Sequence, residues 1–153
     1  MERISKYVSY QEAIKSNTAI KNGIDNAPDA TQLSAMKTVA KNVFDKTREH
    51  FGVPIAVTSF FRSKELNKKI GGASKSDHMD GEAIDMDADL YGEITNKDIF
   101  EYIKDNLEFD KLIWEFGSDD NPAWVHVSYV EGANRKQVMK AIRKNGKTSY
   151  IFV

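Results

Sequence analysis

The chain has 153 residues, of which 41% are hydrophobic, and this is enough for a single domain, 1–153, with a buried core. Its 22 basic and 23 acidic residues give a formal charge of −1, which argues against a nucleic-acid-binding surface. The sequence has no run of about 18 apolar residues that would predict a membrane span. Cysteine is absent, which excludes disulfides, thiolate metal sites and a cysteine nucleophile.

The first half of the chain is predicted to be mainly helical. Ser9 and Glu12 have the spacing of a capping box and predict a short helix over 10–15. The segment 16–30, with turn residues such as Asn22-Gly23, is expected to be an ordered loop. Further elements are predicted as an amphipathic helix over 31–50, a buried strand over 54–58, a helix over 63–69 capped by Ser63, and a polar loop over 73–82.

The second half is predicted to contain most of the strands. In chain order we expect a half-buried strand at 83–87, a helix at 97–106 capped by Asn96, and strands at 112–116 and 123–129 around a hairpin loop at 117–122. Residues 136–143 have some helical character, but Asn145-Gly146 before 148–153 favours a final hairpin. Most predicted helices precede most predicted strands along the chain. This order indicates an α+β fold with helices packed on an antiparallel sheet.

Three residues form a candidate metal site. His78 and Asp85 lie on either side of Gly81, which permits a sharp turn between them, and His126 follows in Trp124-Val125-His126. Two imidazoles and one carboxylate leave a fourth tetrahedral position open, as in catalytic zinc sites. The alternative is that each histidine is an ordinary polar residue near the surface.

The segments that carry these residues resemble a known family. Thr58-Ser59-Phe60-Phe61-Arg62-Ser63, Gly71-Gly72, Ser76-x-His78-x-x-Gly81-x-Ala83-x-Asp85 and Trp124-x-His126-x-Ser128 are similar to the M15 zinc peptidases. That family includes D-alanyl-D-alanine carboxypeptidases and phage L-alanyl-D-glutamate endolysins, and the likeness is to its small single-domain branch. The resemblance implies a hedgehog-type α+β fold and His78, Asp85 and His126 as ligands of Zn²⁺.

The general base is less evident from the sequence. Many members of the family have an acid three residues before the last histidine, but here that residue is Ala123. We expect Glu115 to act instead, because its strand is predicted to pair with the strand of His126 and its apolar neighbours would raise its pKa. The alternatives are a solvent-facing Glu115, with Asp119 or Asp120 as the base.

Several residues are candidates for substrate contacts. Arg62 could hold a substrate carboxylate or the oxyanion, a role that the resemblance supports, or it could form a structural salt bridge in the acidic 77–89 region. The resemblance implies that Ser76 contacts the substrate or supports a ligand. Trp124 could line the cleft, and Asp87 could orient a histidine or be solvated.

These residues indicate a zinc peptidase that cuts a bond of the peptidoglycan stem peptide, as a carboxypeptidase or an endopeptidase. The alternatives are an inactive zinc-bearing binding module, which the missing acid at Ala123 favours, and a phage virion or wall-attachment protein. We expect a monomer without a signal peptide, made in the cytoplasm and acting on the bacterial cell wall after release.

Overall fold

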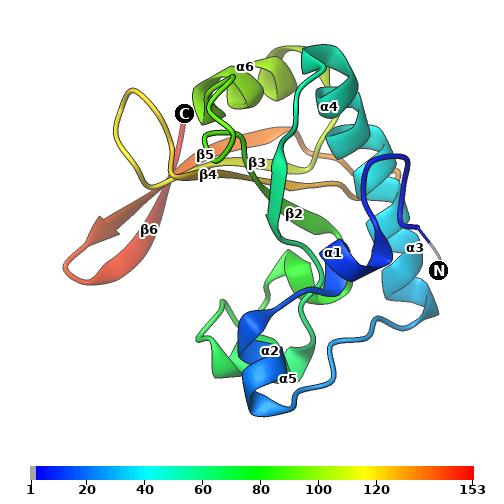
Figure 1. Ribbon diagram of the computed structural model, residues 1–153. Helices are drawn as coiled ribbons and strands as arrows, with labels where there is room; N and C mark the ends of the chain where they lie inside the picture. Colours follow the sequence, from blue (N-terminus) through cyan, green and yellow to red (C-terminus); the bar gives the residue numbers. More distant parts are fainter. Residues whose placement is uncertain (1–2) are drawn as a thin grey trace.

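A computed structural model describes residues 3–153 and shows helices around one mixed sheet (Figure 1). The helices are α1 (Tyr10–Ile14), α2 (Asn17–Asn22), α3 (Ala30–Val39), α4 (Asp45–Phe51), α5 (Lys64–Lys69) and α6 (Asn96–Asn106). A π-helical turn, η1 (Ala40–Phe44), joins α3 to α4, and η2 (Asp77–Asp80) is a 3-10 helix. Within residues 3–153, none of these helices has the length and hydrophobicity that crossing a bilayer requires.

The sheet has six strands in the order β1-β2-β4-β3-β5-β6. Their bounds are β1 (Ala56–Ser59), β2 (Ala83–Asp87), β3 (Lys111–Glu115), β4 (Trp124–Ser128), β5 (Gln137–Lys144) and β6 (Lys147–Phe152). The α+β class is confirmed, but the sheet is not wholly antiparallel, because β3 and β5 run parallel while the other neighbouring strands are antiparallel.

The parallel pair follows from the path of the chain after β4. Residues 129–136 carry the chain back to the beginning of β3, so β5 starts beside β3 and runs in the same direction. Arg135 fixes this return with two charge-assisted hydrogen bonds to the buried Asp110 carboxylate, at 2.8 and 2.9 Å. Backbone hydrogen bonds from Lys136 and Gln137 to Phe109 and Asp110 then start the pairing.

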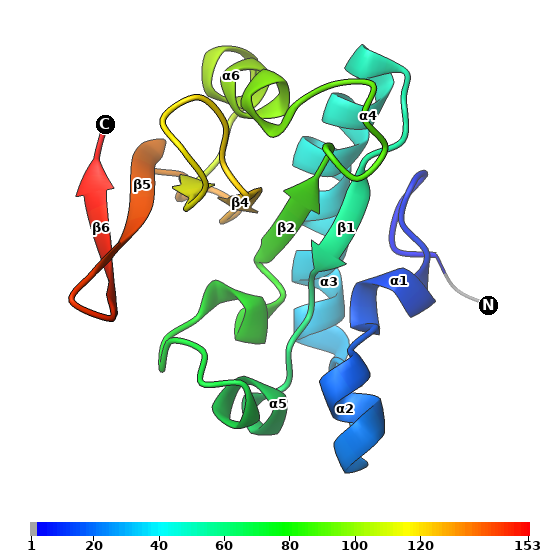
Figure 2. The ribbon, with the colours of Figure 1, turned by 60° about the vertical axis from the view of Figure 1, so that its left-hand side comes forward.

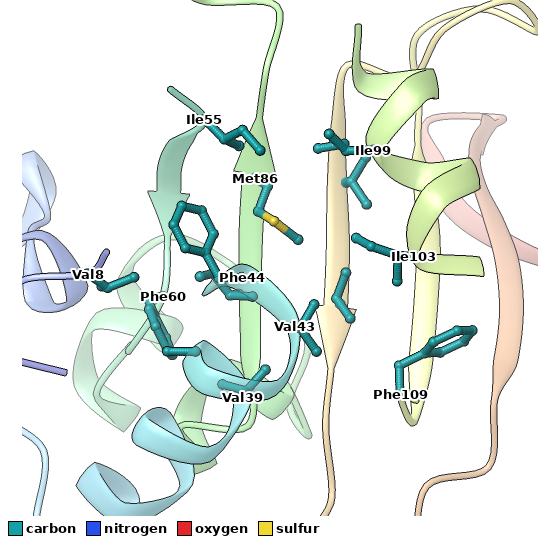
Figure 3. Close-up of a cluster of buried hydrophobic side chains, with 14 of the residues drawn as sticks. Val8, Val39, Val43, Phe44, Ile55, Phe60, Met86, Ile99, Ile103 and Phe109 are labelled. Carbon is teal, nitrogen blue, oxygen red and sulfur yellow. The ribbon is translucent and has the colours of Figure 1, made fainter. Parts of the chain in front are cut away.

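The two faces of the sheet have different roles. Side chains alternate along each strand, and the apolar set faces α3, η1, α4 and α6 (Figure 3). This set includes Ile84, Met86, Leu112, Val125 and Val127, all fully buried. The other set includes Asp85, Glu115 and His126, and the opposite face of the sheet is therefore the one that presents chemistry.

Most predicted elements are confirmed, with two corrections among the helices. The expectation of a loop over 16–30 is wrong in part, because Ser16 caps α2 and Gly23 ends it in the left-handed conformation. Asn96 is not the cap of α6. Thr95 is, through a capping box with Asp98, and the Asn96 side chain is fully buried.

The final hairpin is confirmed, with β5 and β6 joined at Asn145-Gly146. The strand at 83–87 was expected to be half-buried, but four of its five residues are buried. On its second face, Asp85 is packed between His78 and His126. The strand predicted at 54–58 is shifted to 56–59, and the expectation that it is buried is wrong, because it is an edge strand with no buried residue.

Candidate active site

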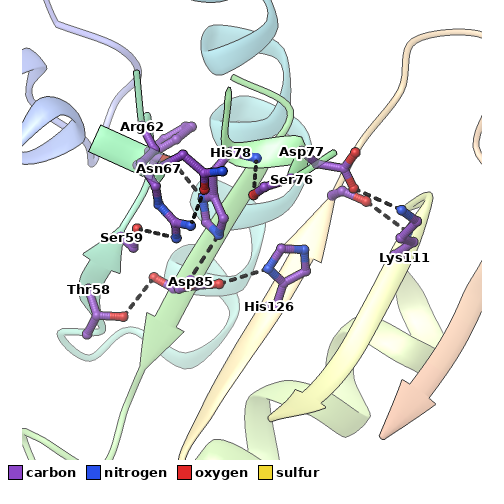
Figure 4. Close-up of polar contacts among 12 residues, drawn as sticks. Thr58, Ser59, Arg62, Asn67, Ser76, Asp77, His78, Asp85, Lys111 and His126 are labelled. Carbon is purple, nitrogen blue, oxygen red and sulfur yellow. Dashed lines mark hydrogen bonds and ion pairs between the residues drawn. The ribbon is translucent and has the colours of Figure 1, made fainter. Parts of the chain in front are cut away.

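The register of β2 and β4 brings the three candidate metal ligands together. Asp85 is directly opposite His126 in this pair, and His78 reaches Asp85 from η2 (Figure 4). Asp85 Oδ2 lies 3.3 Å from His78 Nε2, and Asp85 Oδ1 lies 2.9 Å from His126 Nδ1. One ligand atom from each residue falls within 4.8 Å of the others, so the three residues converge as the sequence predicted.

Local structure explains how His78 is held. The Ser76 hydroxyl accepts a hydrogen bond from the backbone N–H of His78 and caps η2. His78 Nδ1 lies 2.7 Å from the Phe60 carbonyl oxygen, which orients the ring and leaves Nε2 to face Asp85. Gly81 ends η2 with φ 75°, and a Cβ there would lie 2.5 Å from the Gln32 carbonyl oxygen. The sharp turn expected at Gly81 therefore requires glycine for two reasons: its backbone conformation and the lack of space for a side chain.

The donor set suits a divalent transition metal. Burial by itself raises the pKa of Asp85, but the adjacent His78 and His126 outweigh it and hold the pKa below its usual range. Asp85 is thus an ionised carboxylate between two imidazoles, in a buried position. Nitrogen and oxygen donors of this kind, in this number, fit zinc with one open position.

Glu115 lies at the end of β3 on the same face as these residues. It pairs with Trp124 in the β3–β4 ladder and is therefore diagonal to His126, with backbones roughly 7–8 Å apart. Burial raises the pKa of Glu115 to about 7, and while His126 opposes the shift, Asp85 adds to it. The alternative of a solvent-facing Glu115 is wrong, because only 8% of this residue is exposed.

Trp124 presents an unused donor beside Glu115. Among the described residues, its indole N–H is the buried side-chain group that makes no hydrogen bond. Its interaction with Glu115 lowers the pKa of that carboxyl, although the contact falls outside hydrogen-bond geometry. A buried donor without a partner is costly, and it therefore marks a place where a ligand or water would be held.

Arg62 is positioned by neutral partners. Its Nη1 donates to Asn67 Oδ1 at 3.0 Å and its Nη2 to Ser59 Oγ at 3.3 Å (Figure 4). The alternative, in which a salt bridge to the acidic segment 77–89 holds the guanidinium, is therefore wrong. Burial lowers the pKa of Arg62 from its usual value, and the charge of Asp85 opposes that effect. Gly72 makes the arrangement possible, since a Cβ there would lie 2.1 Å from Asn67 Oδ1.

The residues that the sequence singled out share one cleft of about 450 Å³. Its lining includes all three candidate ligands and the predicted Arg62, Ser76, Glu115 and Trp124. Lys75 and Lys111 lie along the same cleft, and Lys111 Nζ is 3.2 Å from Asp77 Oδ2. Asp77 lines the cleft too and offsets the charge of Lys111, so Arg62 and Lys75 are the cations of this cleft outside that ion pair.

Three other candidates lie elsewhere. Asp87 accepts hydrogen bonds from Asn96 Nδ2 and from the backbone of Asp89, so the expectation that it orients a histidine is wrong. Asp119 and Asp120 lie on the exposed loop after β3, and Asp119 is paired with Lys140. The Lys140 ammonium lies over the Trp114 ring, on the helical side of the sheet, which places Asp119 away from the cleft.

Sequence reasoning missed several residues that shape the site. Asn96 donates to Asp87 and to the carbonyls of Pro122 and Ala123, and so fastens the β3–β4 loop beside the site. Asn67, which holds Arg62, was also missed. Tyr150, Phe152, Met139 and Gln137 from the final hairpin line the cleft too. Their spacing of two residues along each strand indicated that they share one face of the sheet. The sequence did not show, however, that β5 would lie beside β3 and bring this face to the cleft.

The comparisons with known proteins agree with this geometry. No curated protein matches the chain. The sequence model described as Peptidase M15 matches residues 6–128, a span that contains every candidate ligand, Arg62 and Glu115. Because this match covers most of the chain and ends on the strand of His126, the chain belongs to the peptidase M15 family.

Proposed function

We propose that this peptidase is a zinc enzyme that hydrolyses a peptide bond of the peptidoglycan stem. The observation that carries the proposal is the convergence of His78, Asp85 and His126 in a cleft that also contains Glu115. A metal bound by the three side chains would supply Lewis acidity, which activates water and polarises a carbonyl.

Glu115 is the proposed general base. A carboxylate with a pKa of about 7 can accept a proton from the attacking water and later donate it to the leaving amine. Its position across the β3–β4 ladder from Trp124 replaces the acid that is missing at Ala123. The Trp124 indole N–H, which has no partner, is available to a substrate oxygen or to an ordered water.

Arg62 is the proposed substrate clamp. Its two guanidinium contacts are with neutral groups, so its positive charge remains available to a carboxylate or a developing oxyanion. Ser76 contributes mainly by supporting His78 through the η2 cap, and it also lines the cleft. A free carboxylate of the stem peptide is the group that the Arg62 guanidinium would bind.

The test is digestion of purified muropeptides with zinc present, followed by mass analysis of the products. We expect cleavage within the stem peptide, and we expect His78→Ala and His126→Ala to lose zinc binding and cleavage together. Full activity in either variant would contradict the proposal. The products also distinguish release of a terminal D-alanine from an internal cut.

A binding module without catalysis is the second candidate, favoured by Ala123 at the position of the usual acid. Glu115→Gln discriminates between the two, because it keeps the shape and the metal ligands but removes the base. The enzyme would lose at least about 100-fold in turnover with little change in peptide affinity. A binding module would have no turnover to lose. We further propose that the protein acts as a monomer on the bacterial cell wall.

A further inference from the structure

The C-terminal hairpin contributes to the cleft although it lies outside the part of the chain that the family model matches. The match ends at residue 128, whereas β5 and β6 occupy residues 137–152. Figure 2 shows this hairpin at the far end of the sheet from β1 and β2. Four of its side chains nevertheless line the same cleft as the candidate ligands.

The strand register arranges these side chains in two rows across the sheet. The first row runs from His126 through Ile113 and Met139 to Phe152. Ile113 and Met139 are buried in a small apolar cluster with Ala141, while Phe152 is 73% exposed. This row is an apolar strip that begins at a candidate metal ligand and ends in solvent.

The second row runs from Trp124 through Glu115 and Ala141 to Tyr150. The methyl group of Ala141 leaves the space between Glu115 and Tyr150 free of a large side chain. Burial raises the pKa of Tyr150, and the charges of Glu115 and Asp85 add to this effect, which places the phenol within electrostatic reach of both carboxylates. Tyr150 and Glu115 line the same cleft, one on each side of Ala141, so the phenol hydroxyl is a hydrogen-bond donor on the wall next to the proposed base.

We propose that the β5–β6 hairpin forms a substrate subsite beside the bond that is cut. Its apolar strip takes an aliphatic side chain of the peptide, and the Tyr150 hydroxyl hydrogen-bonds to the peptide backbone. The subsite rests on the proposed function, and it identifies Phe152 and Tyr150 as specificity-determining residues. Exposed aromatic side chains at a cleft suit this role because they offer a large contact area that a ligand can desolvate.

The position of the hairpin supports this assignment. The bidentate contact of Arg135 with Asp110 and the parallel pairing with β3 hold β5 in register with Glu115. A wall held by a strand ladder positions its side chains more accurately than a loop would. The outer strand β6 is open to solvent, so a peptide can extend across it.

The experiment measures peptide binding without turnover. Zinc-loaded Glu115→Gln protein serves as the parent, and the ligand is a synthetic pentapeptide that ends in D-alanyl-D-alanine, titrated by calorimetry. We expect Phe152→Ala to raise Kd about tenfold and Tyr150→Phe about fivefold, as loss of one apolar or one hydrogen-bonding contact does. In the active enzyme, Phe152→Ala should raise KM more than it lowers kcat.

Ile151→Ala is the matched control, because Ile151 lies between these residues on β6, pairs with Lys140 and does not line the cleft. It should leave Kd within about twofold of the parent. Unchanged Kd in both Phe152→Ala and Tyr150→Phe, or an equal loss in Ile151→Ala, would overturn the subsite. Failure of the proposed function is a different result: the unmodified enzyme then cleaves no muropeptide.

Discussion

At the scale of single residues, Glu115 combines an apolar setting with a charged function. Its neighbours along the chain are Trp114 and Phe116, and the Phe116 backbone is left-handed, with φ 54°. A bulky aromatic residue rarely adopts this conformation, which costs about 1 kcal/mol or more. The bend turns the chain away immediately after Glu115, and Phe116 packs on Trp124 with ring centroids 5.5 Å apart.

The raised pKa of Glu115 predicts a pH-dependent stability difference in Glu115→Gln. The folded pKa is about 7 and the ordinary value is 4.5, so the folded state binds the extra proton between these limits. The contribution of Glu115 to the free energy of unfolding therefore falls as the pH rises from 4.5 to 7, and the Gln variant lacks this contribution. We compare the free energies of unfolding of the two proteins after a chelator has removed the metal. The difference, variant minus wild type, should be larger at pH 8 than at pH 4 by up to about 3 kcal/mol.

Urea unfolding of the chelated proteins at several pH values measures this difference. Glu131→Gln, at an exposed position, is the control and should follow the wild-type pH curve. Parallel pH curves for wild type and Glu115→Gln would mean that Glu115 is not desolvated in the folded protein.

At the scale of secondary-structure elements, the turn between η2 and β2 decides whether His78 reaches Asp85. Gly81→Ala should destabilise the protein by about 2–4 kcal/mol, because it adds a Cβ 2.5 Å from the Gln32 carbonyl at a positive φ. It should also weaken zinc binding, since relief of the clash with α3 displaces the turn that joins His78 on η2 to Asp85 on β2. Thermal unfolding and zinc titration measure the two effects.

Gly132→Ala separates the two causes. Gly132 has nearly the same φ, 74°, but no atom within 4 Å of an added Cβ. The Gly132→Ala protein should lose only about 1 kcal/mol in free energy of unfolding and should bind zinc with unchanged affinity. Equal effects of the two substitutions would show that the contact with α3 is unimportant.

The loop between β3 and β4 depends on one buried side chain. Asn96→Ala removes contacts with Ala88, Asp87, Pro122 and Ala123, and leaves buried backbone groups unpaired. We expect the free energy of unfolding to fall by about 2–4 kcal/mol, as measured by urea unfolding. We also expect a lower kcat for muropeptides, because Glu115 at the start of this loop would be misplaced. Asn106→Ala, at the exposed end of α6, should cost less than about 1 kcal/mol, and a similar loss at both sites would contradict this role of Asn96.

At the scale of the whole molecule, the site joins segments that are distant in the sequence, so metal binding is linked to global stability. Zinc at about 100 times its Kd should raise the free energy of unfolding by about 2.7 kcal/mol and the Tm by roughly 5–10 °C. His126→Ala should abolish the shift. His50→Ala should keep it, because His50 of α4 stacks on Tyr102 of α6, with ring centroids 4.0 Å apart, outside the cleft. A chelator-insensitive wild-type Tm would contradict a metal site.

Local signals in the sequence predicted most elements. Capping residues such as Ser9 and Ser63, the alternation in β2 and the Asn145-Gly146 turn act over a few residues and are visible without tertiary structure. Errors arose where the same residues had another use. Asn22-Gly23 ends a helix rather than forming a loop turn, and Asn96 hydrogen-bonds to a distant loop rather than capping its own helix.

The sequence by itself determined the residue types of the site and the loop and strands that carry them, since two imidazoles, one carboxylate and a glycine turn predict a metal centre. Only the tertiary structure decided that β5 lies beside β3, that Glu115 and Tyr150 share a row, and that the final hairpin lines the cleft. Strand order depends on long-range packing and on contacts such as Arg135 with Asp110, to which no local pattern corresponds.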